Sequence, residues 1–127
     1  MIVLDANVLI GLLDPADANH AAAERLLLAH ASEQFALSVL TFTEFLIRPT
    51  ALGLASTAEA FVANMGVVVS PLLVDDARQL ARMRTASGLK LPDAVVLWLA
   101  QASSAKVMTM DGQLAGTAAA LGIDVVE

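Results

Sequence analysis

Short apolar runs rich in β-branched residues alternate with longer helical patterns along the chain, and this alternation is the feature that most constrains the fold. Strands are expected at Ile2–Leu4, Phe35–Val39, Gly66–Ser70 and Lys106–Thr109, with an edge strand at Ile123–Val126. Strands separated by helical segments favour crossover connections and a parallel sheet. The 127 residues are therefore predicted to form a single α/β domain, residues 1–127, around a mainly parallel sheet of four or five strands.

Helices are expected in the gaps between these runs. One begins at Thr41 and is expected to be broken or to end near Arg48, because Pro49 disfavours helical geometry in the residue before it. Another ends at Gly88, a plausible C-terminal stop. Pro92 lies in the first turn of the next, "DAVVLWLAQASS", which is apolar nearly all round and should pack in the interior or at a subunit contact.

The chain is 57% hydrophobic with a mean hydropathy of +0.71, yet no segment is expected to span a membrane. The longest stretch without a charge, Ala60–Val74, contains Gly66 and Pro71, whereas a spanning helix needs about 20 apolar residues. The N-terminus lacks the features of a signal peptide, and there is no cysteine for disulfides or zinc. The expected location is the cytoplasm.

Thirteen acidic residues against seven basic ones give a formal charge of -6. This is the wrong sign for a protein that holds nucleic acid by broad neutralisation of phosphates. A polyanionic substrate would therefore require metal ions or a local group of bases.

Four acids fall at strand ends or in early helical turns: Asp5, Glu44, Asp93 and Asp111. The carboxyl ends of parallel strands line the ligand crevice of an open α/β sheet, so these four side chains are expected to converge. Packed carboxylates raise one another's pKa unless a cation lies among them. Oxygen-only ligands favour Mg²⁺ or Mn²⁺ over zinc or copper.

Each acid taken alone has a simpler explanation. Asp93 and Asp111 could cap helices, and Glu44 could be an ordinary exposed helical residue. Asp5 is the least easily explained in this way, because it directly follows a buried strand. Taken jointly, the four acids favour a metal site.

Four segments resemble the PIN-domain ribonucleases, and more narrowly the VapC toxins of bacterial toxin–antitoxin pairs: "MIVLDANVLI", "LSVLTFTEFL", "LPDAVVLWLA" and "VMTMDGQL". The resemblance covers nearly the full chain. It implies a small α/β/α fold, an acidic pocket that binds Mg²⁺ or Mn²⁺, and cleavage of RNA. It also implies a cognate antitoxin as protein partner and a homodimer formed through helices.

The resemblance assigns roles residue by residue. The acids that it implies to be catalytic are Asp5, Glu44, Asp93 and Asp111, with Asp5, Asp93 and Asp111 as metal ligands. Asn7 and Thr109 match the polar residues that orient these acids. Where many relatives have a further acid and then phenylalanine, this chain has Gln113 and Leu114, so the number of metal ions stays open.

The expected mechanism is metal-assisted hydrolysis, in which a cation lowers the pKa of its bound water and stabilises charge on phosphoryl oxygens. The products would carry a 5′-phosphate and a 3′-hydroxyl. His20 and His30 both lie on a polar helix and are expected at the surface, so neither is placed for a route through the 2′-hydroxyl.

Few bases are available to bind the substrate. Arg48 lies four residues after Glu44 and would share its helical face, and Lys90 precedes Asp93 closely, so both are candidates for a phosphate contact. Arg78, Arg82 and Arg84 need do no more than keep their helix soluble.

Three other classes of protein were weighed. A receiver-like domain would have paired acids early and a lysine after a late strand, whereas Lys106 precedes its strand. A haloacid-dehalogenase-like phosphatase would have a second aspartate where Asn7 stands. A low-activity or inactive RNA- or protein-binding module of the same fold remains the main alternative. The RNA that is cut and the antitoxin are not specified by the sequence.

Overall fold

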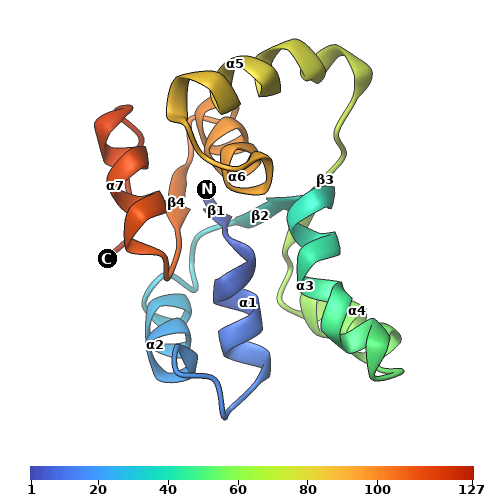
Figure 1. Cartoon of the computed structure of the whole chain (residues 1–127). Coiled ribbons are helices and arrows are strands. Elements are labelled where there is room, and N and C mark those ends of the chain that lie inside the picture. The colour runs from blue at the N-terminus through green and yellow to red at the C-terminus, as the bar shows by residue number, and fades with distance from the viewer.

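Four parallel strands form the centre of the computed structural model, which describes all 127 residues (Figure 1). They are β1 (Ile2–Leu4), β2 (Phe35–Ser38), β3 (Val68–Ser70) and β4 (Lys106–Met108), in the order β3-β2-β1-β4. This confirms the prediction of an α/β fold with a parallel sheet. The expected edge strand at Ile123–Val126 is reduced to a single parallel bridge between Val125 and Val107.

The side chains of the central strand β1 lie in two hydrophobic cores, one on each face of the sheet. Ile2 and Leu4 belong to one core, and Val3, which points the other way, belongs to the second. In β4, Met108 belongs to the first core and Val107 to the second. A strand buried on both faces has no polar side chain along its length, which explains the unbroken apolar run at the start of the sequence.

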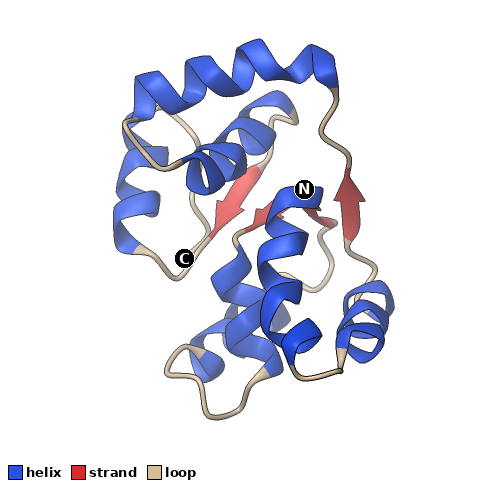
Figure 2. Ribbon diagram, turned by 45° about the vertical axis from the view of Figure 1, so that its right-hand side comes forward, coloured by secondary structure: helices blue, strands red, loops and turns tan.

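Four helices pack against the first core (Figures 1 and 2). They are α1 (Ala6–Leu13), α2 (His20–Ala29), α3 (Val39–Ala51) and α4 (Ala55–Asn64). Leu9, Leu27 and Phe45 contribute the large buried side chains of these helices, together with Val62.

The second core lies under three helices: α5 (Ala77–Ser87), α6 (Leu91–Ala102) and α7 (Gly112–Ala120). A short 3₁₀ turn, Val74–Asp76, precedes α5 and has no buried residue. Every residue from Ala94 to Ala100 is buried, so α6 packs in the interior as predicted. None of the helices is long and apolar enough to cross a membrane.

Two predicted helix ends have different outcomes. The prediction that the helix after β2 ends near Arg48 is wrong, because α3 continues through Pro49 to Ala51. A proline so close to the C-terminus removes only one helical hydrogen bond, and the Pro49 carbonyl still accepts from the backbone N–H of Leu52 and Leu54. The stop at Gly88 is confirmed: it ends α5 with a φ of +70°, a conformation that glycine adopts without strain.

Candidate active site

The strand order reverses at β1, which has β2 on one side and β4 on the other. Such a reversal opens a crevice outside the carboxyl ends of the two diverging strands. The backbone N–H of Asp5 donates to the carbonyl of Met108 at 2.9 Å and so continues the pairing of β1 with β4 by one residue. Asp5 and the segment after β4 therefore meet at the reversal point.

Asp5 is the most buried acid of the molecule, with 7% of its surface exposed. It caps α1: Oδ1 accepts from the backbone N–H of Ala6 at 2.8 Å, while Oδ2 accepts from the hydroxyl of Thr109 at 2.7 Å. Burial raises the pKa of Asp5 above its ordinary value, although both hydrogen bonds lower it. The charges of Asp93 and Asp111 raise the pKa further.

The hydroxyl of Thr109 joins three other residues. It donates its proton to Asp5 and accepts from Asn7 Nδ2 at 3.3 Å and from the backbone N–H of Asp111 at 3.0 Å. A hydroxyl offers one donor and two acceptor sites, so Thr109 uses all its hydrogen-bonding capacity here. Its one proton is thereby directed to the Asp5 carboxylate.

Asn7 holds the loop after β4 in place. Its Oδ1 accepts from the backbone N–H of Met110 at 3.0 Å, and its Nδ2 donates to Thr109. Asn7 thus positions the acids indirectly, through Thr109 and the loop, and makes no hydrogen bond to a carboxylate.

Asp111 is the N-cap of α7, the capping role left open for it by the sequence. Its Oδ1 accepts from the backbone N–H of Gln113 at 2.9 Å and of Leu114 at 3.4 Å. The second carboxylate oxygen accepts no hydrogen bond within the protein. Asp111 also raises the pKa of Asp5 and of Asp93, so a capping residue takes part in the acidic cluster.

Glu44 in α3 and Asp93 in the first turn of α6 complete the acidic cluster, which we define as Asp5, Glu44, Asp93 and Asp111. Partial burial is the largest cause that raises the pKa of both Glu44 and Asp93. Asp5 and Asp93 raise the pKa of Glu44 further, while Lys90 lowers that of Asp93. No hydrogen bond acts on either carboxylate. The charges of these acids therefore act on one another in part: Asp93 and Asp111 raise the pKa of Asp5, and no such effect links Glu44 with Asp111.

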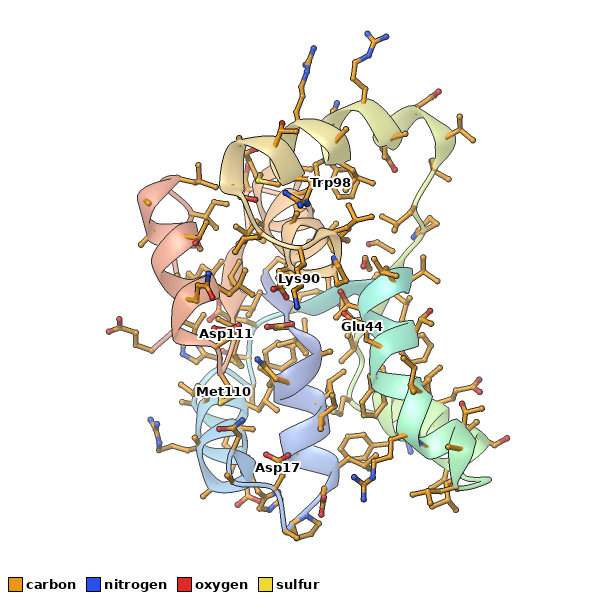
Figure 3. The ribbon with its side chains drawn as sticks, viewed as in Figure 1. Asp17, Glu44, Lys90, Trp98, Met110 and Asp111 are labelled. Carbon is orange, nitrogen blue, oxygen red and sulfur yellow. The ribbon has the colours of Figure 1, made fainter.

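Figure 3 shows how separate elements supply this region. Glu44 from α3, Lys90 from the turn before α6 and Asp111 from the start of α7 approach the first turn of α1. Asp17 lies at the opposite end of α1, where it accepts from the backbone N–H of Asn19. Asp17 therefore lies outside the acidic cluster.

The donor set suits a hard divalent cation, because it consists of oxygen atoms alone and carries excess negative charge. No three Asp, Glu or His side chains are already arranged around one point as ligands. Asp5 is held by two hydrogen bonds, whereas none holds Glu44 or Asp93. Ligation of an ion would therefore involve rotation of these two freer side chains toward Asp5.

The two candidate substrate contacts differ in their placement. Lys90 is close enough to Asp93 to lower its pKa. Arg48 forms no ion pair with Glu44 and is not among the charges that act on the pKa of Glu44. The structure thus places Lys90 beside Asp93, whereas Arg48 makes no ion pair with any acid of the cluster.

The histidines lie outside the cluster and are engaged elsewhere. His20 Nδ1 lies 2.9 Å from the carbonyl of Gly11, and His30 Nδ1 lies 2.8 Å from Glu33. Both side chains are only partly exposed, at 26% and 24%, so they are less open than expected of surface residues.

The sequence analysis gave no role to Ser38 or Thr41, which are buried at the carboxyl end of β2. Ser38 is the N-cap of α3: its Oγ accepts from the backbone N–H of Thr41 at 3.1 Å. The two hydroxyls lie 3.2 Å apart. The predicted strand, Phe35–Val39, ends one residue too late and the predicted helix start, Thr41, is two residues late, because Ser38 already caps α3. This cap fixes the helix that carries Glu44.

Comparison with known proteins identifies one family and a group of similar structures. The PIN domain family profile matches residues 2–120. The fold resembles the VapC20 toxin of Mycobacterium tuberculosis, a sarcin–ricin loop cleaving toxin, with a TM-score of 0.80 and 19% identity over 100% of this chain and 99% of that one.

A chain of a toxin–antitoxin complex from Klebsiella pneumoniae gives a TM-score of 0.77 with 24% identity, over 91% of this chain and 92% of that one. VapBC2 from Rickettsia felis, solved with a DNA fragment from its promoter, gives 0.72 with 13% identity, over 100% and 98%. No curated protein sequence matches significantly. Identities this low establish a shared fold alone.

Proposed function

The chain belongs to the PIN-domain family, and on this premise we propose that it is a Mg²⁺- or Mn²⁺-dependent endoribonuclease, the toxin of a toxin–antitoxin pair. PIN domains are typically nucleases, and this group generally uses divalent metals. The observation that carries the proposal is the placement of Asp5 at the reversal point of the sheet, where its backbone N–H pairs with Met108 and Thr109 orients its carboxylate. Burial first, and neighbouring carboxylates second, raise the pKa of Asp5, Glu44 and Asp93. Such a cluster is costly without a cation.

The proposed metal ligands are Asp5, Asp93 and Asp111, with Glu44 completing the pocket directly or through water. A bound cation would lower the pKa of a water molecule and neutralise charge that develops on the phosphoryl oxygens. Thr109 keeps the Asp5 carboxylate in one orientation by donating to Oδ2. Lys90 offers a positive charge beside Asp93 for a substrate phosphate.

Attack by water is favoured over attack by the 2′-hydroxyl of RNA. The second route commonly relies on side chains that transfer protons near neutral pH, for which histidine is best suited. His20 and His30 pair with groups on and beside α2, away from the acidic cluster. The proposed products therefore carry a 5′-phosphate and a 3′-hydroxyl.

A cognate antitoxin and a second copy of the chain are the proposed protein partners. Support comes from relatives solved as toxin–antitoxin complexes. Large apolar side chains exposed between α3 and α4, namely Ile47, Leu52 and Leu54, give independent support for a covered surface, since they are 65%, 62% and 52% exposed.

A second candidate function is that of an RNA- or protein-binding module with little or no activity. The observation that favours it is that no three acidic side chains are already arranged as ligands of one ion. Motif and fold do not by themselves establish turnover.

Cleavage of labelled RNA by the purified chain, freed of any partner, separates the two candidates. The nuclease proposal predicts cleavage in Mg²⁺ or Mn²⁺ that is abolished by EDTA and by Asp5→Asn and Asp93→Asn. Asp124→Asn is the matched control, because Asp124 is an exposed acid outside the cluster. RNA binding by a folded wild-type protein with no metal-dependent cleavage would support the binding module instead.

A further inference from the structure

Basic residues are concentrated in one short segment of this acidic chain. Residues 77–92 contain Arg78, Arg82, Arg84 and Lys90 and no acid, whereas the rest of the chain contains the other three bases and all 13 acids. The segment lies between Asp75–Asp76 and Asp93, so its four positive charges are grouped within a chain of net charge -6.

These four positive charges are not used to hold the fold together. All the ion pairs of the molecule involve His20, His30 or Lys106, so Arg78, Arg82 and Arg84 are unpaired. All three arginine side chains are exposed on α5. Arg78 and Arg82 lie four residues apart on one side of the helix, and we call this pair the α5 arginine face.

The α5 arginine face is connected directly to the acidic cluster. Helix α5 packs along α6 (Figure 1). The turn at Gly88 leads through Lys90 to Asp93 in the first turn of α6. From Asp93 to Gln101 the axis of α6 advances about 12 Å at 1.5 Å per residue. A strand of RNA at the cluster could therefore extend over α5 within a few nucleotides.

A hollow of about 330 Å³ lies beside Arg82, between α5, α6 and the end of α7. Met83, Trp98 and Leu121 give it an apolar lining, and Gln79 and Gln101 contribute amides. Trp98 Nε1 donates to Gln79 Oε1 at 3.1 Å. The amide nitrogen of Gln79 therefore points away from the indole and is free to donate to a ligand. Apolar walls with amides and a guanidinium suit an unstacked nucleobase.

We propose that the α5 arginine face binds phosphates of the RNA outside the cleaved bond and that the adjacent hollow accepts an unstacked base. This inference rests on the proposed function, because it assigns the substrate of the same site. RNA fits this surface better than an acidic peptide does. The carboxylates of a peptide would use only the arginines, whereas RNA would use the arginines for its phosphates and the hollow for a flat polar base.

Binding of labelled single-stranded RNA, measured over a range of salt concentrations, tests the phosphate contacts. Arg78→Gln and Arg82→Gln should each weaken binding several-fold, equally for RNAs of unrelated sequence. Each should also reduce the slope of log affinity against log salt by about 1. Arg25→Gln, an exposed arginine on α2, is the control and should leave both quantities unchanged. An unchanged slope in both α5 variants would overturn the phosphate contact.

The hollow is tested separately by Ala86→Phe, which fills it from an exposed position on its rim without changing the charge. RNA affinity should fall several-fold while the salt slope stays the same. Unchanged affinity would overturn the base site. If the α5 variants lost binding to poly-glutamate but kept full RNA binding, the face would belong to an acidic protein partner and the proposal would be wrong.

Failure of the proposed function gives a different result from failure of this inference. A wild-type protein that neither cleaves nor binds RNA contradicts both. A wild-type protein that cleaves RNA, with α5 variants that bind as tightly as wild type, contradicts only the role of α5.

Discussion

The hydroxyl of Thr109 donates to Asp5 Oδ2 at 2.7 Å, although the two residues are separated by 104 positions in the sequence. This bond joins the ends of two adjacent strands where the strand order reverses. Because Thr109 also accepts from Asn7 and Asp111, one hydroxyl couples the most buried acid to the loop that carries another acid of the cluster.

Replacement of Thr109 by valine should reduce RNA cleavage by about 10- to 100-fold, the usual effect of removing a residue that orients a metal ligand. Valine keeps the shape but leaves Asp5 Oδ2 without its donor, so stability should also fall by about 1–3 kcal/mol. Thr109→Ser is the control that retains the hydroxyl. Steady-state cleavage rates and thermal melting measure the two effects, and equal activity of the valine and serine variants would contradict this role.

Without divalent cations, the contribution of the acidic cluster to stability should decrease as pH rises from about 4 toward neutrality. Asp5, Glu44 and Asp93 have folded-state pKa values raised above their ordinary values. The folded state therefore holds more protons than the unfolded state, and the stabilisation present below the ordinary pKa is lost as pH passes through the raised ones. Glu33, whose pKa is lowered by its hydrogen bond to His30, acts in the opposite direction.

Mg²⁺ should restore this lost stability at neutral pH, by about 2.7 kcal/mol when present at 100 times its dissociation constant. Melting curves with and without Mg²⁺ separate the effect of the acidic cluster from that of Glu33, because Glu33 lies outside the cluster. Asp93→Asn removes one proposed ligand and should reduce the response to Mg²⁺. A melting temperature that does not respond to Mg²⁺ in the wild-type protein would argue against a cation site.

Gly88→Ala should destabilise the protein by about 1 kcal/mol, since the left-handed conformation at φ +70° is unfavourable for alanine. Gly116→Ala provides a matched control in the middle of α7, where nothing lies within 4 Å of the added methyl group. There the same change should stabilise by about 0.5–1 kcal/mol. Denaturant unfolding measures both, and stabilisation of the protein by Gly88→Ala would contradict the capping role.

Lys90→Gln should raise the KM for RNA several-fold and more than Arg48→Gln does. Lys90 lies beside Asp93, whereas Arg48 makes no ion pair with Glu44. Arg25→Gln again serves as the control for loss of one exposed charge. A larger effect at Arg48 than at Lys90 would place the substrate on α3 instead of at the start of α6.

The positions of two of the four acids, Asp5 and Asp111, depend on local signals that are visible in the sequence. Asp5 and Asp111 each follow an apolar strand and cap the next helix. The strand and the cap together place each acid at the carboxyl end of its strand. The path of α3 through Pro49 was missed, because tertiary packing at a buried proline outweighed its local preference. The hydrogen bonds of Thr109 with Asp5 and Asn7 depend on strand order, which no local pattern specifies.

The chemical ends of the RNA products test the central claim most directly, because they report which oxygen attacks the phosphorus. Hydrolysis by water at the acidic cluster predicts a 5′-phosphate and a 3′-hydroxyl at every cut made in Mg²⁺. It also predicts that these ends disappear together in EDTA and in Asp93→Asn. Products that end in a 2′,3′-cyclic phosphate, formed equally well in EDTA, would contradict the account.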